Sequence, residues 1–191
     1  CIRDRYTYSD WHDKSGTIPV TWQVDDYESL PWYRYPDKDK GFTTKSNNYD
    51  IYGERLGCYI PKFEEAGKGI FVPKNVDKIF GPVLDYFDID DSVYAFAKYT
   101  PGMILPWHQD NYPTYARNKS AAVEQIVRIM VFLHDPAPGH QLWIKDKFCT
   151  GQAGTWYSWQ GATTHMAANL AETDRYVIQI TGKAKRNPVN V

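Results

Sequence analysis

The sequence predicts an all-β core with helical support, so the chain is α+β as a whole. From Ser92 onward, short apolar stretches alternate with turns rich in Gly and Pro, which is typical of a β-sandwich or barrel. A helical repeat of apolar residues precedes these stretches. The chain is also 16% aromatic, and we interpret most of these large side chains as filling a β-rich core.

Five strands are expected in this second half of the chain. The strongest candidate is Gln125 to Leu133, whose residues are mostly apolar and which ends at the turn sequence Asp135 to Gly139. The others are Ser92 to Tyr99, Gln141 to Ile144, Gly154 to Trp159 and Arg175 to Thr181.

One helix is expected before the strands. Its apolar residues recur at intervals of three and four, and Asn75 is placed to cap its first turn. Gly81 and Pro82 lie in its middle, so we expect it to kink or to divide into two short pieces. Its apolar face consists of Val76, Ile79, Phe80, Val83, Leu84 and Phe87. Residues 1–70 predict only loops, short strands and one or two helical turns.

The length of 191 residues fits one domain spanning 1–191. A domain of this size buries about 70% of the surface that its unfolded chain exposes, so it needs no disulfide to fold. We expect residues 1–91 to support the fold and to shape a substrate pocket, residues 92–182 to form the core, and residues 183–191 to be a tail.

Charge and cysteine content narrow the classes of partner. Lys and Arg total 22 and Asp and Glu total 23, so the near-neutral chain is not expected to bind nucleic acid. Three widely spaced cysteines, Cys1, Cys58 and Cys149, favour a reducing compartment over a disulfide framework. No apolar run reaches membrane-spanning length, and the start shows no signal-peptide pattern. We therefore expect a cytoplasmic protein without a membrane partner, and the oligomeric state stays open.

Two histidines and one aspartate are candidates for a metal site. His108 and Asp110 are two residues apart, and on an extended strand such residues point the same way. His165, one of five histidines, is the candidate third ligand and lies 55 residues after Asp110. Two imidazoles and one carboxylate leave coordination positions open, which suits Fe(II) chemistry with O2. The His-x-Asp pair alone is a weak signal, but Arg175 follows His165 by 10 residues at the start of a strand.

This arrangement resembles the 2-oxoglutarate/Fe(II)-dependent dioxygenase superfamily, in particular its prolyl-hydroxylase-like and aspartyl/asparaginyl-hydroxylase-like branch. The family pattern His-x-Asp … His … Arg is matched by His108, Asp110, His165 and Arg175. The strands around these residues are similar as well, and the resemblance covers about residues 92–182. It implies a double-stranded β-helix, which is a jelly-roll, cupin-like barrel.

The resemblance also implies cofactors and roles. His108, Asp110 and His165 would be the metal ligands and catalytic residues, with Fe(II), 2-oxoglutarate and O2 as cofactor and cosubstrates. Arg175 would grip the distal carboxylate of 2-oxoglutarate through two parallel hydrogen bonds. Tyr99 lies where similar proteins hydrogen-bond the cosubstrate, and a core tyrosine is the alternative. The expected reaction is hydroxylation of a C–H bond with release of succinate and CO2.

Arg128 is unusual because it lies inside the strongest apolar strand. A buried charge without a partner costs several kcal/mol, so this side chain must reach an anion or the mouth of the barrel. A place at the site, in contact with the cosubstrate or the substrate, and a structural salt bridge are both open.

The remaining candidates are histidine, amide and indole side chains. His134 and His140 flank a Pro/Gly turn and are expected to be solvated. Asn169 is expected either to support the metal ligands or to lie in a loop, and His12 has no predicted partner. The candidates for lining a cleft, each with core packing as the alternative, are Trp107, Trp143, Trp156 and Trp159.

Two other functions compete with the oxygenase. A metal-binding cupin-like enzyme of the isomerase type would not need Arg175 as a carboxylate anchor, and a non-catalytic binding module would bind its ligands without turnover. Residues 1–91 and 111–124 are expected to shape the substrate pocket. Their aromatic and mixed-charge content favours a peptide side chain or a small amino-acid-like molecule as the substrate.

Overall fold

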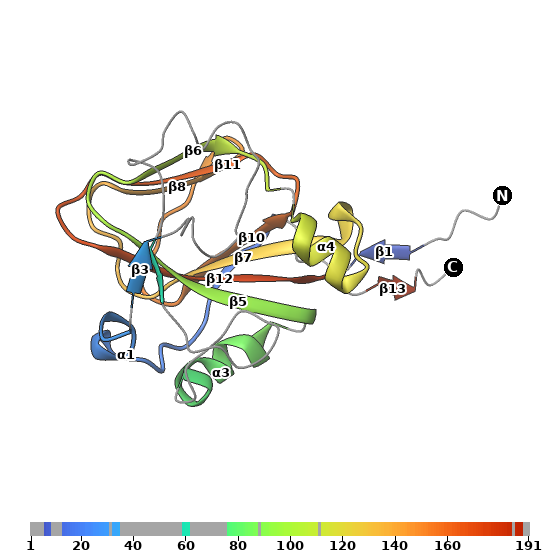
Figure 1. Cartoon of the computed structure of the whole chain (residues 1–191), viewed down its shortest axis with the longest axis horizontal. Helices are drawn as coiled ribbons and strands as arrows, with labels where there is room; N and C mark the ends of the chain where they lie inside the picture. The colour runs from blue at the N-terminus through green and yellow to red at the C-terminus, as the bar shows by residue number, and fades with distance from the viewer. Residues whose placement is uncertain are drawn as a thin grey trace.

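Two antiparallel β-sheets lie face to face in the computed structural model of the chain (Figure 1). The structure describes residues 6–8, 13–30, 32–34, 59–61, 76–87, 89–110, 112–184 and 186–188. Strands dominate these residues and helices flank them, so the predicted all-β core with helical support is confirmed.

The larger sheet has seven strands, and all neighbouring pairs are antiparallel. In spatial order they are β2 (Ser15–Thr17), β10 (Thr155–Gln160), β7 (Ile126–Phe132), β12 (Arg175–Lys183), β5 (Asp90–Tyr99), β4 (Tyr59–Pro61) and β3 (Trp32–Arg34). Strand β7 lies between β10 and β12 and is almost wholly buried, which explains its apolar sequence, since a strand covered on both faces does not alternate with polar residues.

The smaller sheet has four antiparallel strands. In spatial order they are β6 (Ile104–His108), β11 (His165–Asn169), β8 (His140–Ile144) and β9 (Lys147–Phe148). Figure 1 shows β6, β8 and β11 as one layer above β5, β7, β10 and β12. A separate two-stranded ribbon pairs β1 (Tyr6–Tyr8) with β13 (Arg186–Pro188), close to the two chain ends.

Among the described residues, three α-helices and one 3-10 helix accompany the sheets. They are α1 (Val24–Glu28), α3 (Val76–Tyr86), α4 (Pro113–Lys119) and η2 (Val123–Gln125). Helix α3 is the predicted helix, and it runs through Pro82 as one element, so the alternative of two pieces is wrong. Burial of its apolar face compensates for the backbone hydrogen bond that proline cannot make. The predicted cap, Asn75, lies outside the described residues.

The hydrophobic core is divided between the two faces of the larger sheet. Below the sheet, Phe80 and Val83 of α3 and Phe87, which follows the helix, pack against outward-facing residues such as Ile129 and Ile178. Between the sheets, a second cluster joins alternate residues of the larger sheet to Leu142, Ile144 and Ala167 of the smaller one. Because consecutive residues of a strand face opposite ways, one strand serves both clusters and directs every second side chain into the barrel.

The predicted strands are all present, with ends shifted by one or two residues. Strand β11 was not predicted as a strand. Its sequence, His165-Met166-Ala167-Ala168-Asn169, lacks the β-branched and aromatic residues that favour strands. It forms because β6 and β8 pair with it on both sides, so its conformation comes from tertiary contacts rather than from local preference.

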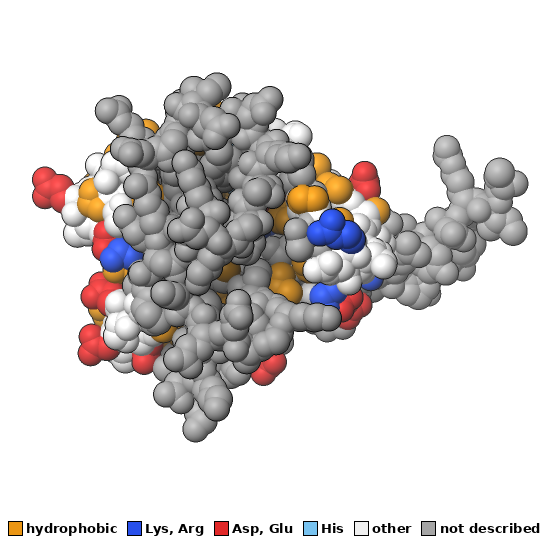
Figure 2. Space-filling view, in the orientation of Figure 1, with side chains coloured by type: hydrophobic (Ala, Val, Ile, Leu, Met, Phe, Trp, Pro, Cys, Tyr) orange, Lys and Arg blue, Asp and Glu red, His pale blue; other side chains and the backbone are white. Residues whose placement is uncertain are grey.

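The surface of the described residues carries charges of both signs. On the face seen in Figure 2, acidic and basic side chains are interspersed. No described helix combines the length and apolar character needed to cross a membrane. Cys149 is buried and unpaired, and Cys1 and Cys58 lie outside the described residues.

His134 and His140 are not solvated, contrary to the expectation from the sequence. His140 is buried, and its ring accepts a hydrogen bond from the Ala137 amide and donates one to the carbonyl of Thr173. His134 accepts a hydrogen bond from the amide of Tyr176. Burial, followed by the neighbouring His140, lowers the pKa of His134 from 6.5 to about 4. Both rings therefore serve the fold as neutral hydrogen-bonding groups.

The neutral state of His134 predicts a loss of stability in acid. The unfolded chain takes up this proton near pH 6.5 and the folded chain only near pH 4, so the free energy of unfolding should fall as the pH drops between these values. In His134→Gln, whose carbonyl can still accept the Tyr176 amide, urea denaturation at pH 7, 6, 5 and 4.5 should show a shallower fall. An unchanged slope would assign the acid sensitivity to the other histidines.

Candidate metal centre

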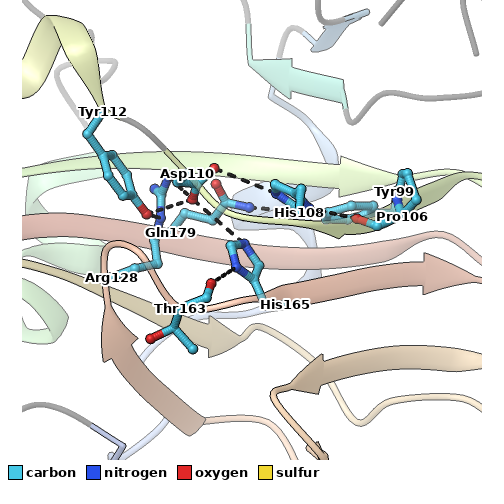
Figure 3. Close-up of polar contacts among 9 residues, drawn as sticks. All are labelled: Tyr99, Pro106, His108, Asp110, Tyr112, Arg128, Thr163, His165 and Gln179. Carbon is cyan, nitrogen blue, oxygen red and sulfur yellow. Dashed lines mark hydrogen bonds and ion pairs between the residues drawn. The ribbon is translucent and has the colours of Figure 1, made fainter. Parts of the chain in front are cut away.

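The pairing of β6 with β11 brings the three predicted ligands together. In the antiparallel register His108 faces His165, and the centroids of their rings lie 4.3 Å apart. Asp110 follows two residues after His108, just beyond the end of β6. Its Oδ1 lies 3.6 Å from His108 Nε2, and its Oδ2 lies 3.7 Å from His165 Nε2 (Figure 3). The three ligand atoms lie within 4.8 Å of one another, a spacing that can hold a metal ion.

A β-bulge turns His108 toward the barrel interior. His108 pairs with His165 and Leu105 pairs with Ala167, so three steps along β6 match two along β11. Leu105 packs into the inner core. Strict alternation would therefore direct His108 outward, but the extra residue at Pro106 and Trp107 reverses its direction. Trp107 is 50% exposed, as expected of the residue that the bulge pushes out.

Backbone carbonyls fix the tautomers of both histidines. The Nδ1 of His108 donates to the Pro106 carbonyl oxygen at 2.7 Å, and the Nδ1 of His165 donates to that of Thr163 at 2.9 Å. A carbonyl only accepts, so each neutral ring carries its proton on Nδ1 and keeps a lone pair on Nε2. The Nε2 atoms are the ones that face Asp110, which is the tautomer that metal ligation requires.

The site favours an ionised carboxylate and a neutral His165. Burial opposes the charge on Asp110, but the guanidinium of Arg128 and the hydrogen bond of His108 hold the pKa of this carboxyl well below its usual range. Burial lowers the pKa of His165 to about 4. For His108 burial is again the largest single effect and acts to lower the pKa, but the interaction with the Asp110 carboxylate and the hydrogen bond to the Pro106 carbonyl together raise the pKa of the ring. One anionic oxygen donor and imidazole nitrogens form a set that suits a divalent first-row metal.

Arg175 is a buried cation without an acidic partner. Its side chain is 2% exposed at the start of β12, and no carboxylate among the described residues forms an ion pair with it. Its Nη1 donates to the Gln141 carbonyl at 2.7 Å, and its Nη2 lies 3.6 Å from Met130 Sδ. Burial lowers the pKa of Arg175 to about 10, so the group stays charged at neutral pH. The barrel interior therefore holds a cation that suits an anionic ligand.

Tyr99 links this cation to the metal side of the barrel. Tyr99 pairs with Arg175 across β5 and β12, and the guanidinium carbon lies 5.3 Å from the centre of its ring. Its hydroxyl accepts a hydrogen bond of 3.1 Å from Gln179 Nε2 (Figure 3). Gln179 was not singled out from the sequence, although its place on the inward face of the Arg175 strand was a usable signal.

Arg128 lies at the site rather than at a remote salt bridge. Its Nη2 lies 3.2 Å from Asp110 Oδ2, and its Nε donates to the hydroxyl of Tyr112 at 3.0 Å. The sequence left two roles open for Arg128, a place at the site and a salt bridge. The structure combines them, because the acid that neutralises Arg128 is a candidate metal ligand. Tyr112 was missed entirely. Its hydroxyl donates to Asp110 at 2.6 Å, and only its distance of two residues from that ligand hinted at a role.

The other predicted site residues have structural positions. Asn169 is buried and holds the β11–β12 turn by donating to the carbonyls of Tyr99 and Thr173. Trp159 is buried in the inner core beside His165, with ring centroids 5.0 Å apart. The remaining three indoles do not pack in this inner cluster, since Trp156 packs below the larger sheet, Trp107 is exposed and Trp143 stacks on Phe148. His12 lies outside the described residues.

Comparison with known proteins identifies the fold. No family model and no curated protein matches the sequence. A prolyl-4-hydroxylase from Pseudomonas putida is similar in structure, with a TM-score of 0.52 and 13% identity over 91% of this chain and 94% of that chain. A cupin protein from Bacteroides fragilis has a TM-score of 0.37 and 13% identity, over 64% of this chain and 84% of its own. A predicted oxalate decarboxylase from Thermotoga maritima has a TM-score of 0.39 and 12% identity, over 66% and 81%.

The two facing antiparallel sheets and the similarity to the prolyl-4-hydroxylase define the fold class. The core is a double-stranded β-helix, as the resemblance in the sequence implied. Identities this low establish the fold and leave the chemistry to the residues inside the barrel.

Replacing Asp110 tests the metal centre directly. In Asp110→Asn the amide oxygen can still accept from Tyr112 and Arg128, but the anionic ligand is lost. The affinity for Fe(II), titrated anaerobically, should fall more than the factor of about 10–100 that is typical of removing an outer partner. Asp146→Asn, at an exposed carboxylate in the β8–β9 turn, is the matched control and should bind as the parent does. Equal affinities in all three proteins would exclude Asp110 as a ligand.

Proposed function

We propose that this protein is an Fe(II)- and 2-oxoglutarate-dependent oxygenase that hydroxylates a C–H bond. The observation that carries the proposal is Arg175, a buried guanidinium without a carboxylate partner among the described residues, inside the same barrel as the candidate metal centre. An uncompensated buried charge is costly, so such a cation suits a ligand that brings its own carboxylate. A metal enzyme that uses no acidic cosubstrate has no need of it.

The chemistry of 2-oxoglutarate matches this pair of sites. One end carries a carboxylate beside a keto group, which together chelate a metal, and the other end carries a second carboxylate. Guanidinium has five N–H donors in a planar fork, and Arg175 uses one of them on Gln141 and sets Nη2 against the weakly accepting sulfur of Met130. It keeps donors for two parallel hydrogen bonds to a carboxylate. The Tyr99 hydroxyl, which Gln179 orients, suits the space between the two ends.

The protein's own residues hold and orient the reactants. The Nε2 lone pairs of His108 and His165 and one oxygen of Asp110 would hold Fe(II) on one face, so that positions on the opposite face stay open. When bound, Fe(II) with 2-oxoglutarate and O2 supplies the oxidising power for attack on an unactivated C–H bond. The apolar surroundings of His165, including Trp159, keep bulk water from this side of the centre.

The substrate class rests on composition. The segments 1–91 and 111–124 combine aromatic residues with charges of both signs, which favours a peptide side chain or a small amino-acid-like molecule over a nucleic acid. The prolyl-4-hydroxylase from Pseudomonas putida is similar in fold, and at 13% identity it adds nothing on the substrate.

Changing Arg175 separates cosubstrate binding from metal binding. Arg175→Gln should weaken 2-oxoglutarate binding by about 2–5 kcal/mol, or about 30-fold and more, because the distal carboxylate loses its cation. The metal affinity should stay within about twofold of the parent's, since Arg175 does not contact the three ligands. Arg175→Lys, which keeps the charge and loses the planar fork, should bind 2-oxoglutarate with an affinity between those of the parent and Arg175→Gln. Calorimetry of the metal-free protein with Fe(II), and of the metal-loaded protein with 2-oxoglutarate, gives the two constants, and an unchanged affinity of Arg175→Gln for 2-oxoglutarate would place the anchor elsewhere.

Isotope labelling tests the reaction. Protein loaded with Fe(II) and 2-oxoglutarate under anaerobic conditions is mixed with a library of peptides and amino-acid-like metabolites, and ¹⁸O2 is then admitted. Label should enter both succinate and the hydroxylated product. Metal binding without consumption of 2-oxoglutarate would favour a cupin-like enzyme of another kind, and an unlabelled product formed without exchange with water would indicate desaturation or ring closure.

A further inference from the structure

Two side chains hold the carboxylate of Asp110 through one of its two oxygens, Oδ2. We propose that Arg128 and Tyr112 form a carboxylate clamp that holds Asp110 Oδ2 and so presents Oδ1 alone to the metal, making both of them positioning residues of the centre. The proposal rests on the metal-binding part of the proposed function and requires neither 2-oxoglutarate nor a particular substrate.

The contacts form a closed triangle. Tyr112 donates its hydroxyl to Asp110 Oδ2 at 2.6 Å, and Arg128 Nη2 donates to the same oxygen at 3.2 Å. Arg128 Nε donates to the Tyr112 hydroxyl at 3.0 Å, and the guanidinium carbon lies 4.9 Å from the centre of the Tyr112 ring (Figure 3). Each clamp residue thus fixes the other as well as the carboxylate. The two donors occupy Oδ2, which also lies 3.7 Å from His165 Nε2, whereas Oδ1 accepts from neither donor and lies 3.6 Å from His108 Nε2.

The backbone at Tyr112 is strained in a way that favours this contact. Its φ of 45° and ψ of 40° lie in the left-handed region, which a bulky aromatic residue rarely adopts. No side-chain cap on the following helix α4 accounts for the conformation. Strained residues persist where the surrounding structure determines them, and they concentrate at functional sites. Here the strain places the phenol hydroxyl on the carboxylate.

A glycine makes room for the Tyr112 ring. A Cβ atom added to Gly161 would lie 3.1 and 3.2 Å from two carbons of that ring and 3.2 Å from Ile126. This is tighter than ordinary van der Waals contact, so the ring would have to move. Gly161 closes the end of β10 through its amide, which donates to the Ile126 carbonyl at 2.8 Å. The space that the Tyr112 ring occupies is therefore bounded by the barrel wall rather than by a surface loop.

The charge of Arg128 also serves to hold Asp110. The residue lies in β7 between the buried Val127 and Ile129, where a cation needs an anionic partner. Among the described residues, the carboxylate that meets it is Asp110. The two contacts thus orient the carboxylate before any metal arrives. Outer partners of this kind orient ligands and set the affinity of metal sites.

Cobalt binding by the whole chain tests the clamp without relying on turnover. Co²⁺ is titrated into the parent, Tyr112→Phe, Arg128→Gln and Arg128→Lys, and its affinity and visible absorption spectrum are recorded under anaerobic conditions. Tyr112→Phe and Arg128→Gln should lose affinity by about 10- to 100-fold. Their spectra should change as well, because Oδ2 loses one of its two donors and competes better with Oδ1 for the metal. Arg128→Lys keeps the charge and should recover part of the affinity.

Controls separate positioning from folding. Arg117→Gln removes a cation from the exposed face of α4 and should bind Co²⁺ as the parent does. Gly161→Ala, which touches neither the ligands nor the clamp's polar atoms, should shift the ring and weaken binding in the same direction as Tyr112→Phe. Circular dichroism of each metal-free variant checks the fold, and Tyr112→Phe, which loses a single hydroxyl, is the decisive variant.

The outcomes distinguish the clamp from the metal centre itself. If the parent binds Co²⁺ and the folded clamp variants bind it with the same affinity and spectrum, the clamp is overturned and the metal centre stands. If the variants lose thermal stability alone, Arg128 and Tyr112 are structural, and the clamp is again overturned. If the parent binds no Co²⁺, the metal-binding part of the proposed function fails and the clamp fails with it.

Discussion

The antiparallel pairing of β6 with β11 is the constraint on which the site depends. These two short strands come from distant parts of the sequence, and β11 is extended because its neighbours pair with it, since its own residues do not favour a strand. The larger sheet, with its apolar β7 and the packing of α3, provides the rigid base on which the smaller sheet closes. The larger sheet thus provides the packing that stabilises the fold, and the smaller sheet largely sets the geometry of the ligands.

Two arginines inside one barrel show how partners decide the role of a residue. Arg128 meets a carboxylate and a phenol, and its neighbours Tyr112 and Asp110 raise its pKa against the effect of burial. Arg175 meets a carbonyl, a sulfur atom and two aromatic rings, and burial prevails and lowers its pKa. The charge of Arg128 is balanced by Asp110, and no carboxylate among the described residues balances that of Arg175. The same side-chain chemistry is therefore placed in two different environments within one barrel.

The sequence predicted those parts of the structure that depend on local pattern. The strands around Ile129 and Ile178 follow from apolar residues with β preference, and the α3 face follows from the helical period. The triad and Arg175 were found because the resemblance fixes their order and spacing. The burial of His140 was missed because its partner Thr173 lies 33 residues away. Tyr112 was missed because its strained backbone and its seat at Gly161 depend on contacts between distant segments.

The bulge at Pro106 and Trp107 has a consequence for how such a centre arises and is lost. Two residues separate Leu105 from His108, so strict alternation would turn the imidazole away from the side that Leu105 faces, and the bulge is what brings both side chains to the interior. The direction of the imidazole is therefore a property of the backbone and not of the histidine itself. A substitution that flattened the bulge would turn the imidazole out of the barrel, although all three ligand residues would still be present in the sequence.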